Sequence, residues 1–129
     1  MSWLDIVSNP KAIAHLYDEV PPLNNMEVIK LTLKSAGPTL TFQMDMPRFA
    51  DHRPARWEPE SNTVSVELDF FAVENLQITG FPSMPILAFE MKKEGRLIAV
   101  SALGENCKLE FSCLDVSIQK ASGYVKGVA

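Results

Sequence analysis

The residues best suited to acid–base chemistry lie close together in the middle of the chain. His52 is next to Asp51, and Glu58 follows shortly after. A histidine beside a carboxylate is the minimum that general acid–base catalysis needs. Such a pair usually works with a nucleophile and an oxyanion-binding group, and the sequence has neither motif. We therefore favour a solvated loop of mixed charge over a hydrolase or lyase working from His52, and we expect no catalytic residue.

The same region holds the best set of candidate metal ligands. These are Asp45, Asp51, His52, Glu58 and Glu60. A metal site needs three or four ligands that converge, and this spacing matches no known binding pattern. The sequence also lacks a glycine-rich phosphate loop followed by a helix. We expect neither a metal nor another cofactor.

The two cysteines, Cys107 and Cys113, do not have the spacing of zinc ligands. On one continuous strand they would lie roughly 20 Å apart, beyond the reach of a disulfide. We expect both to be reduced thiols in the core or on the surface.

Length and charge limit the kinds of partner that the chain can have. Its 129 residues fit one domain over residues 1–129, built around one core. The formal net charge of -4 disfavours nucleic acid as a partner, because binding to the phosphate backbone depends on clustered lysine and arginine. A basic protein partner fits this charge better.

Targeting and membrane-spanning segments would indicate where in the cell the protein resides. The first residues have neither the cationic region nor the apolar run of a signal peptide. No later segment approaches the ~20 apolar residues of a membrane-spanning helix. We expect a cytoplasmic protein that does not associate with membranes.

A helix is predicted near the N-terminus. Asn9-Pro10 combines a capping residue with a proline at the first helical position, and Pro21-Pro22 ends the segment. Ile13, Leu16 and Tyr17 recur at helical spacing, which gives one apolar stripe. We expect this stripe to pack against the rest of the protein.

Alternating apolar residues predict a sheet after the two prolines. The predicted strands span residues 26–34, 39–46, 63–70, 87–93, 96–103, 108–113 and 116–125. In the first of them, Ile29, Leu31 and Leu33 share one side and are expected to face the core. We predict a mostly β, α+β fold: an N-terminal helix followed by about seven mainly antiparallel strands in a twisted sheet, sandwich or barrel.

The segment 47–62 has no periodicity and carries several prolines, which is typical of a long loop. Loops of this kind often carry function. We predict that the loop binds the partner through its charged side chains: Asp51, Arg53, Arg56, Glu58 and Glu60. Trp57 is either an interface residue or a lid over the core, and we favour the lid.

The order of these features resembles a known family. Trp3-Leu4 stands near the start, the helix ends in Glu19-Val20-Pro21-Pro22, and a hairpin precedes the proline-rich loop with Trp57. The loop leads into residues 62–71 (NTVSVELDFF), followed by Val73, Leu76, Ile78 and Gly80. This pattern is similar to the Immunity protein 50 family of bacterial polymorphic toxin systems over nearly the whole chain. The resemblance implies a small cytoplasmic antidote that binds and blocks a cognate toxin, without catalytic residues.

Three hypotheses follow for the function. The first is toxin neutralisation, through the 47–62 loop or through an acidic face of the sheet. The second is a small-molecule-binding domain, with a cavity between helix and sheet lined by Phe42, Phe70 and Phe89. The third is the hydrolase or lyase built on His52. The first hypothesis requires that the adjacent gene encodes a toxin that this chain counteracts. The second requires that a ligand stabilises the protein, and the third requires that His52 lies against Asp51 or Glu58.

Overall fold

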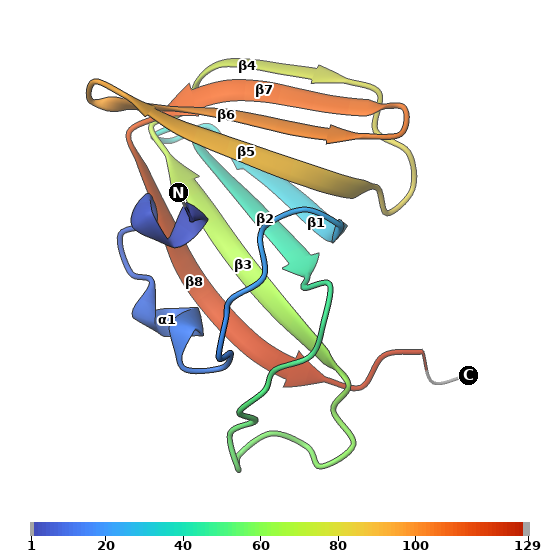
Figure 1. The fold of residues 1–129 in the computed structure, drawn as a ribbon. Coiled ribbons are helices and arrows are strands. Elements are labelled where there is room, and N and C mark those ends of the chain that lie inside the picture. Colours follow the sequence, from blue (N-terminus) through green and yellow to red (C-terminus); the bar gives the residue numbers. More distant parts are fainter. Residues whose placement is uncertain (1, 128–129) are drawn as a thin grey trace.

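A computed structural model of the chain describes residues 2–127, which form eight strands and two short helical segments (Figure 1). The helical segments are the 3-10 turn η1 (Trp3–Asp5) and the single turn α1 (Lys11–Ala14). The strands are β1 (Met26–Lys34), β2 (Thr39–Asp45), β3 (Thr63–Phe71), β4 (Glu74–Thr79), β5 (Ile86–Glu94), β6 (Leu97–Gly104), β7 (Cys107–Cys113) and β8 (Asp115–Tyr124). No helix within residues 2–127 is long and apolar enough to cross a bilayer.

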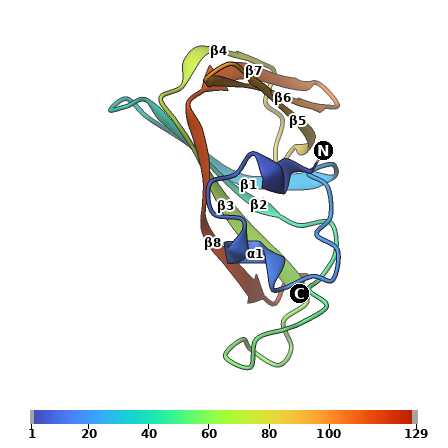
Figure 2. The same ribbon diagram turned by 60° about the vertical axis from the view of Figure 1, so that its left-hand side comes forward.

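All the strand pairs are antiparallel and belong to one open sheet of order β4-β7-β6-β5-β1-β2-β3-β8. The sheet is narrowest where β1 meets β5, because only Met26 with Leu87 and Glu27 with Ile86 are in register there. Figures 1 and 2 show the consequence: β4, β5, β6 and β7 form an upper half-sheet that folds over a lower half-sheet of β1, β2, β3 and β8. The predicted mostly β, antiparallel class is confirmed, and its form is an open sheet.

The chain passes between the two half-sheets at two neighbouring turns. The chain turns between β3 and β4 at Ala72, whose φ of 56° lies in the left-handed region, and between β7 and β8 at Leu114. The backbone N–H of Leu114 donates to the carbonyl of Phe71 at 3.0 Å, so the two turns lie side by side. β4 is the strand that the sequence pattern missed, since Leu76 is its only half-buried residue and no buried alternation marks it.

The predicted N-terminal helix is much shorter than expected. Only one turn forms, and the side chain of Asn9 does not cap it. That side chain instead bonds to the edge of β8: its Oδ1 accepts from the N–H of Ile118 at 2.8 Å, and its Nδ2 donates to the carbonyl of Ile118 at 2.7 Å. An isolated turn gains little without its cap, so the rest of the segment is irregular. The predicted apolar stripe is nevertheless buried, with Ile13, Leu16 and Tyr17 all in the core.

The expected facing of β1 is wrong in its first half. Val28 pairs with Met44 and Lys30 with Gln43, so Ile29 is an extra residue, a β-bulge. Because a bulge reverses the alternation, Met26 and Val28 face the core and Ile29 is 37% exposed. Beyond the bulge Leu31 is half-buried, as predicted, whereas Leu33, predicted to face the core as well, is 57% exposed near the end of the strand.

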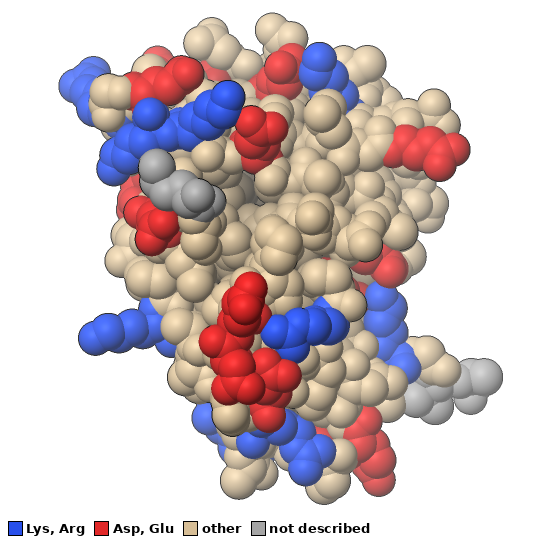
Figure 3. Space-filling view, viewed as in Figure 1, with Lys and Arg blue, Asp and Glu red and all other residues tan. Residues whose placement is uncertain are grey.

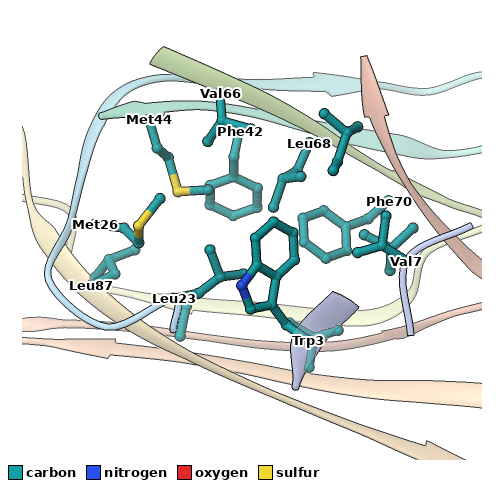
Figure 4. Packing of buried hydrophobic residues seen from close by; sticks show 14 of the residues in the cluster. Trp3, Val7, Leu23, Met26, Phe42, Met44, Val66, Leu68, Phe70 and Leu87 are labelled. Atoms are coloured by element: carbon teal, nitrogen blue, oxygen red, sulfur yellow. The ribbon is translucent and has the colours of Figure 1, made fainter. Parts of the chain in front are cut away.

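The core lies between the two half-sheets and the N-terminal segment. Phe42 stands at its centre, with edge-to-face contacts to Phe70 at 5.5 Å and to Phe89 at 5.2 Å between ring centroids. Figure 4 shows Trp3, from the N-terminal segment, next to Phe42 and Phe70, with Leu23 beside it. The rings of Phe42 and Phe70 are fully buried and fill the interior themselves. The predicted cavity lined by the three phenylalanines is therefore absent from the described part of the chain.

The two cysteines of β7 are unpaired and buried in the core, as expected. Burial raises the pKa of the Cys113 thiol to about 11. Cys113 is therefore a protonated, apolar-like core residue at neutral pH.

Candidate functional site

The predicted loop lies between β2 and β3, beyond the ends of the lower half-sheet (Figure 1). Trp57 anchors it, with only 8% of its surface exposed. Its ring fills the space beside Gly123 of β8, where an added Cβ would lie 2.3 Å from Cε3 of the indole. Phe49 packs edge-on against the indole at 5.9 Å. The interpretation of Trp57 as a lid over the core is confirmed, and Gly123 is what makes room for it.

The first half of the loop is bound to the segment after α1. The carbonyl of Leu16 accepts hydrogen bonds from the N–H groups of Asp51, at 2.8 Å, and His52, at 3.0 Å. The hydroxyl of Tyr17 donates to the carbonyl of Arg48 at 2.7 Å, and the guanidinium of Arg48 lies 4.8 Å from the centroid of the Tyr17 ring. Burial raises the pKa of Tyr17 to about 12, so its hydroxyl remains a donor at neutral pH.

Asp51, a predicted partner-binding residue, lies at the surface, and both of its carboxylate oxygens are hydrogen-bonded within the protein. One oxygen accepts from the N–H of Asp18 at 2.9 Å, and the other accepts from Arg48 at 3.0 Å. The bond from the Asp18 backbone, followed by the bond from Arg48, lowers the pKa of Asp51. Its visible role is to hold the loop against the segment after α1.

His52 does not pair with Asp51 or Glu58, as the acid–base hypothesis required. Its Nε2 contacts Oδ1 of Asp18, from a different segment, and both side chains are more than half exposed. The hydrogen bond of the imidazole to the Asp18 carboxylate raises the pKa of His52. The geometry that would have supported a hydrolase or lyase at Asp51 or Glu58 is therefore not formed.

The other four predicted residues lie on the outer part of the loop and are exposed: Arg53, Arg56, Glu58 and Glu60. A guanidinium nitrogen of Arg53 donates to the carbonyl of Pro59, which braces the loop across its own turn. Arg56, Glu58 and Glu60 take part in no ion pair within residues 2–127. Their charges are thus available to another molecule.

The candidate metal ligands do not converge. Asp51 and His52 lie against the segment after α1, Glu58 and Glu60 lie on the loop surface, and Asp45 belongs to a separate cluster. Among the residues that the structure describes, no three of His, Cys, Asp and Glu come together as metal ligands.

Sequence reasoning missed a charged cluster at the base of the loop. Asp45, the last residue of β2, is only 3% exposed. Its Oδ2 accepts from Nζ of Lys126 at 2.6 Å and from the hydroxyl of Tyr124 at 2.7 Å. The same lysine donates to Oε1 of Glu27 at 2.9 Å. Oδ1 of Asp45 is buried and has no hydrogen-bond partner in the described residues.

This cluster perturbs the groups around it. The hydrogen bonds to Asp45 and then to Glu27 raise the pKa of Lys126. Burial, followed by the bond to Asp45, raises the pKa of Tyr124 to about 12. The alternation of apolar residues in 39–46 predicts that Asp45 faces solvent. No sequence pattern links it to Lys126, which follows the last strand. The buried position of this carboxylate is therefore visible only in the folded protein.

The cluster forms the floor of a cleft of about 400 Å³. Its walls include Pro47 and Phe49 at the start of the loop, Asn62 at its end, and Ile86 at the start of β5. The Asn62 side chain holds the C-terminal segment, residues 125–127, in place. Its Nδ2 donates to the carbonyl of Lys126, and its Oδ1 accepts from the N–H of Lys126, both at 2.9 Å. The cleft thus touches both ends of the loop and the C-terminal segment.

Charged side chains are unevenly spread over the face that Figure 3 shows. They lie at the upper left, at the right-hand edge and in the lower part of the view, while the middle of the face is mostly uncharged. In the lower part, where the loop lies in Figure 1, acidic and basic side chains lie next to each other. The loop end is therefore one of the regions of this face where charge can contribute to recognition.

Comparison with known proteins gives one result. The family model described as Immunity protein 50 matches residues 9–124. No curated protein and no solved structure matches the chain. The matched range begins just before α1 and ends with the last residue of β8, so it includes every strand of the sheet.

Proposed function

The chain belongs to the Immunity protein 50 family, and we propose on this ground that it binds a cognate bacterial toxin domain and blocks its activity. The match over residues 9–124 is the observation that carries the proposal. In this proposal residues 1–129 are one cytoplasmic domain that protects the cell producing the toxin. It acts by occupying a surface of the toxin and catalyses no reaction.

The 47–62 loop is the proposed contact surface. Its backbone is held by Trp57 on one side and by the hydrogen bonds to Leu16 on the other. A loop held in this way loses little conformational entropy on binding, which favours affinity. Arg53, Arg56, Glu58 and Glu60 are the proposed contacts, because they are exposed on this anchored frame. Asp51, whose two oxygens bond to Asp18 and Arg48, holds the loop in place and contributes indirectly.

The charge of the protein supports a basic binding surface on the toxin. The formal net charge of -4 would attract such a surface and speed the encounter. It also disfavours a competing interaction with nucleic acid. We expect association to slow as ionic strength rises, because salt screens this attraction.

Co-expression tests the proposal in cells. The toxin C-terminal domain encoded next to this chain is induced with and without the chain, and growth is recorded. Protection by the wild-type chain is expected, with reduced protection by a Glu58→Lys, Glu60→Lys double variant, which would repel a basic surface. A Glu90→Lys, Glu94→Lys double variant on β5 is the matched control, since it makes the same charge change at exposed positions away from the loop. Equal killing with and without the wild-type chain would reject the proposal.

A second candidate function is binding of a small apolar molecule. A groove of about 610 Å³ lies between the N-terminal segment and β5, with Trp3, Leu23 and Phe89 in its walls. It retains one of the three phenylalanines of the cavity hypothesis and is mostly apolar, as ligand sites commonly are. Thermal unfolding with a panel of apolar compounds tests it. A Phe89→Ala variant should lose any stabilisation that the wild-type protein gains from a compound.

A further inference from the structure

The cleft at the base of the loop already holds a cationic side chain that belongs to the chain itself. Lys126 follows the end of β8 and reaches back over Asp45 and Glu27. It uses Oδ2 of Asp45 and Oε1 of Glu27, and Oδ1 of Asp45 has no partner among residues 2–127. Leaving a buried carboxylate oxygen without a hydrogen bond lowers the stability of the folded state. Lys126 therefore satisfies only part of the hydrogen-bonding capacity of Asp45.

The walls of the cleft suit a long aliphatic side chain with a charged end. Ile86 is 55% exposed at its rim, and Pro47 and Phe49 form the opposite, loop-side part of the lining. Lysine and arginine both place an apolar stem along such surfaces. An arginine has five donors in a planar fork, which can bond both oxygens of a carboxylate. It can therefore use the free oxygen of Asp45 that one ammonium group leaves unpaired.

The attachment of Lys126 is limited to a few bonds. Its backbone is held by the side chain of Asn62, which is also the last residue of the loop. The next residue, Gly127, has a positive φ of 80°, and a Cβ there would meet nothing within 4 Å. Residues 125–127 lie outside the strands, so the lysine can leave the cleft without breaking the sheet.

We propose that the cleft over Glu27 and Asp45 is the receptor for an arginine side chain of the toxin, and that Lys126 occupies it until this arginine displaces it. The identity of the partner rests on the proposed function; the cation-binding cleft does not. Displacement would couple toxin binding at the loop to release of residues 125–127, because Asn62 is the last residue of the loop and its side chain bonds to the backbone of Lys126.

The cleft is tested without the toxin by emptying it and supplying a small cation. A Lys126→Ala variant should unfold roughly 5–10 °C below the wild type, because Asp45 loses its counter-ion while still buried. Butylguanidinium chloride at millimolar concentration should restore at least ~2 °C, saturably, by binding the folded state. Lys120→Ala, which removes an exposed lysine of β8, is the charge-matched control and should gain nothing from the salt.

Two further arms decide whether the restored stability comes from the cleft. A Lys126→Ala, Asp45→Asn double variant should show no gain, and tetramethylammonium, a cation without N–H donors, should produce none in Lys126→Ala. An equal gain in either arm, or no gain from butylguanidinium in Lys126→Ala, would overturn the proposal. If Lys126→Ala does not fold, Lys126→Gln takes its place, since it keeps most of the length and one donor group.

The toxin complex tests the displacement itself. Asp45→Asn should weaken toxin binding at least ~10-fold, while Lys126→Ala should bind severalfold more tightly because the cleft is already empty. Equal weakening by the two variants would show that Lys126 is only a structural tie and would overturn the displacement. If the wild-type chain fails to bind the toxin at all, the proposed function fails, and the butylguanidinium experiment still decides whether the cleft binds a cation.

Discussion

The indole of Trp57 occupies the space that a side chain on Gly123 would need, with Cε3 only 2.3 Å from the position of the missing Cβ. Through this contact a loop residue closes the core over β8, and the loop and the sheet fix each other's position. The loop is therefore part of the folded framework, and changes in the sheet can move the proposed binding surface.

Gly123→Ala should consequently displace Trp57. Overpacking of this kind costs about 1–3 kcal/mol of unfolding free energy. Chemical denaturation measures the cost, and tryptophan fluorescence should shift to the red as the indole becomes exposed. Ser122→Ala, one residue away and half-buried, is the control and should keep both the stability and the emission maximum. An unchanged emission maximum in Gly123→Ala would show that the close contact does not hold the indole.

The pair of His52 and Asp18 should make the stability of the loop depend on pH. The pKa of His52 is raised from its ordinary value of 6.5 by this pair, so the folded state binds the proton more tightly than the unfolded state does. The stabilisation is fully present below about pH 6.5 and is lost as pH rises through the raised pKa. In the wild type the denaturation midpoint should therefore decrease between pH 5.5 and 8.5, and Asp18→Asn should reduce this decrease. His15→Ala, which leaves the pair intact, should keep it.

The opposite sign applies to Asp51. Its pKa is lowered by the bonds from Asp18 and Arg48, so its contribution is present above the ordinary value of 3.8 and disappears as pH falls through the lowered pKa. Asp51→Asn should remove an acid-side loss of stability below about pH 4. Amide exchange of Asp18, whose N–H donates to Asp51, should also accelerate in this variant. Glu58→Gln is the control, and a matching acid-side change there would contradict the assignment to Asp51.

Asn9 should protect the edge of the sheet. Its side chain bonds to both the N–H and the carbonyl of Ile118, the two hydrogen bonds that a neighbouring strand would make. Asn9→Ala should therefore cost roughly 1–2 kcal/mol of unfolding free energy and expose this edge. Hydrogen exchange at the Ile118 amide is the direct measurement and should quicken at least ~10-fold. Asn24→Ala, at an exposed position before β1, should leave that amide protected.

Sequence reasoning worked best where burial alternates strictly. In β3, Val64, Val66, Leu68 and Phe70 are buried in turn, and the strand was predicted almost to its ends. It failed where one residue breaks the period: the bulge at Ile29 reverses β1, and β4 has no buried alternation to detect. The helix was overpredicted because Asn9, a good cap by type, bonds to a strand more than a hundred residues away in sequence.

In the candidate site, too, local sequence patterns predicted some features and long-range contacts determine the others. The loop was found because prolines and charges interrupt the period, and the burial of Trp57 was expected from its type. The partner of His52 was wrong, since Asp18 comes from a segment distant in sequence and near in space. The cluster of Asp45 with Lys126 also depends on long-range contacts, which neither composition nor spacing reveals. Local patterns thus located the loop, and only the fold identified the bonds that hold it in place.

The most direct test of the central claim is the affinity of the purified chain for the purified toxin domain from the adjacent gene, measured by titration calorimetry. The proposed function predicts a stoichiometric complex with a Kd of about 10⁻⁸ M or below. The Glu58→Lys, Glu60→Lys double variant should weaken it at least ~10-fold, and the control on β5 should leave it unaffected. Absence of binding by the wild-type chain at micromolar concentrations, with a toxin that is folded and active, would contradict it.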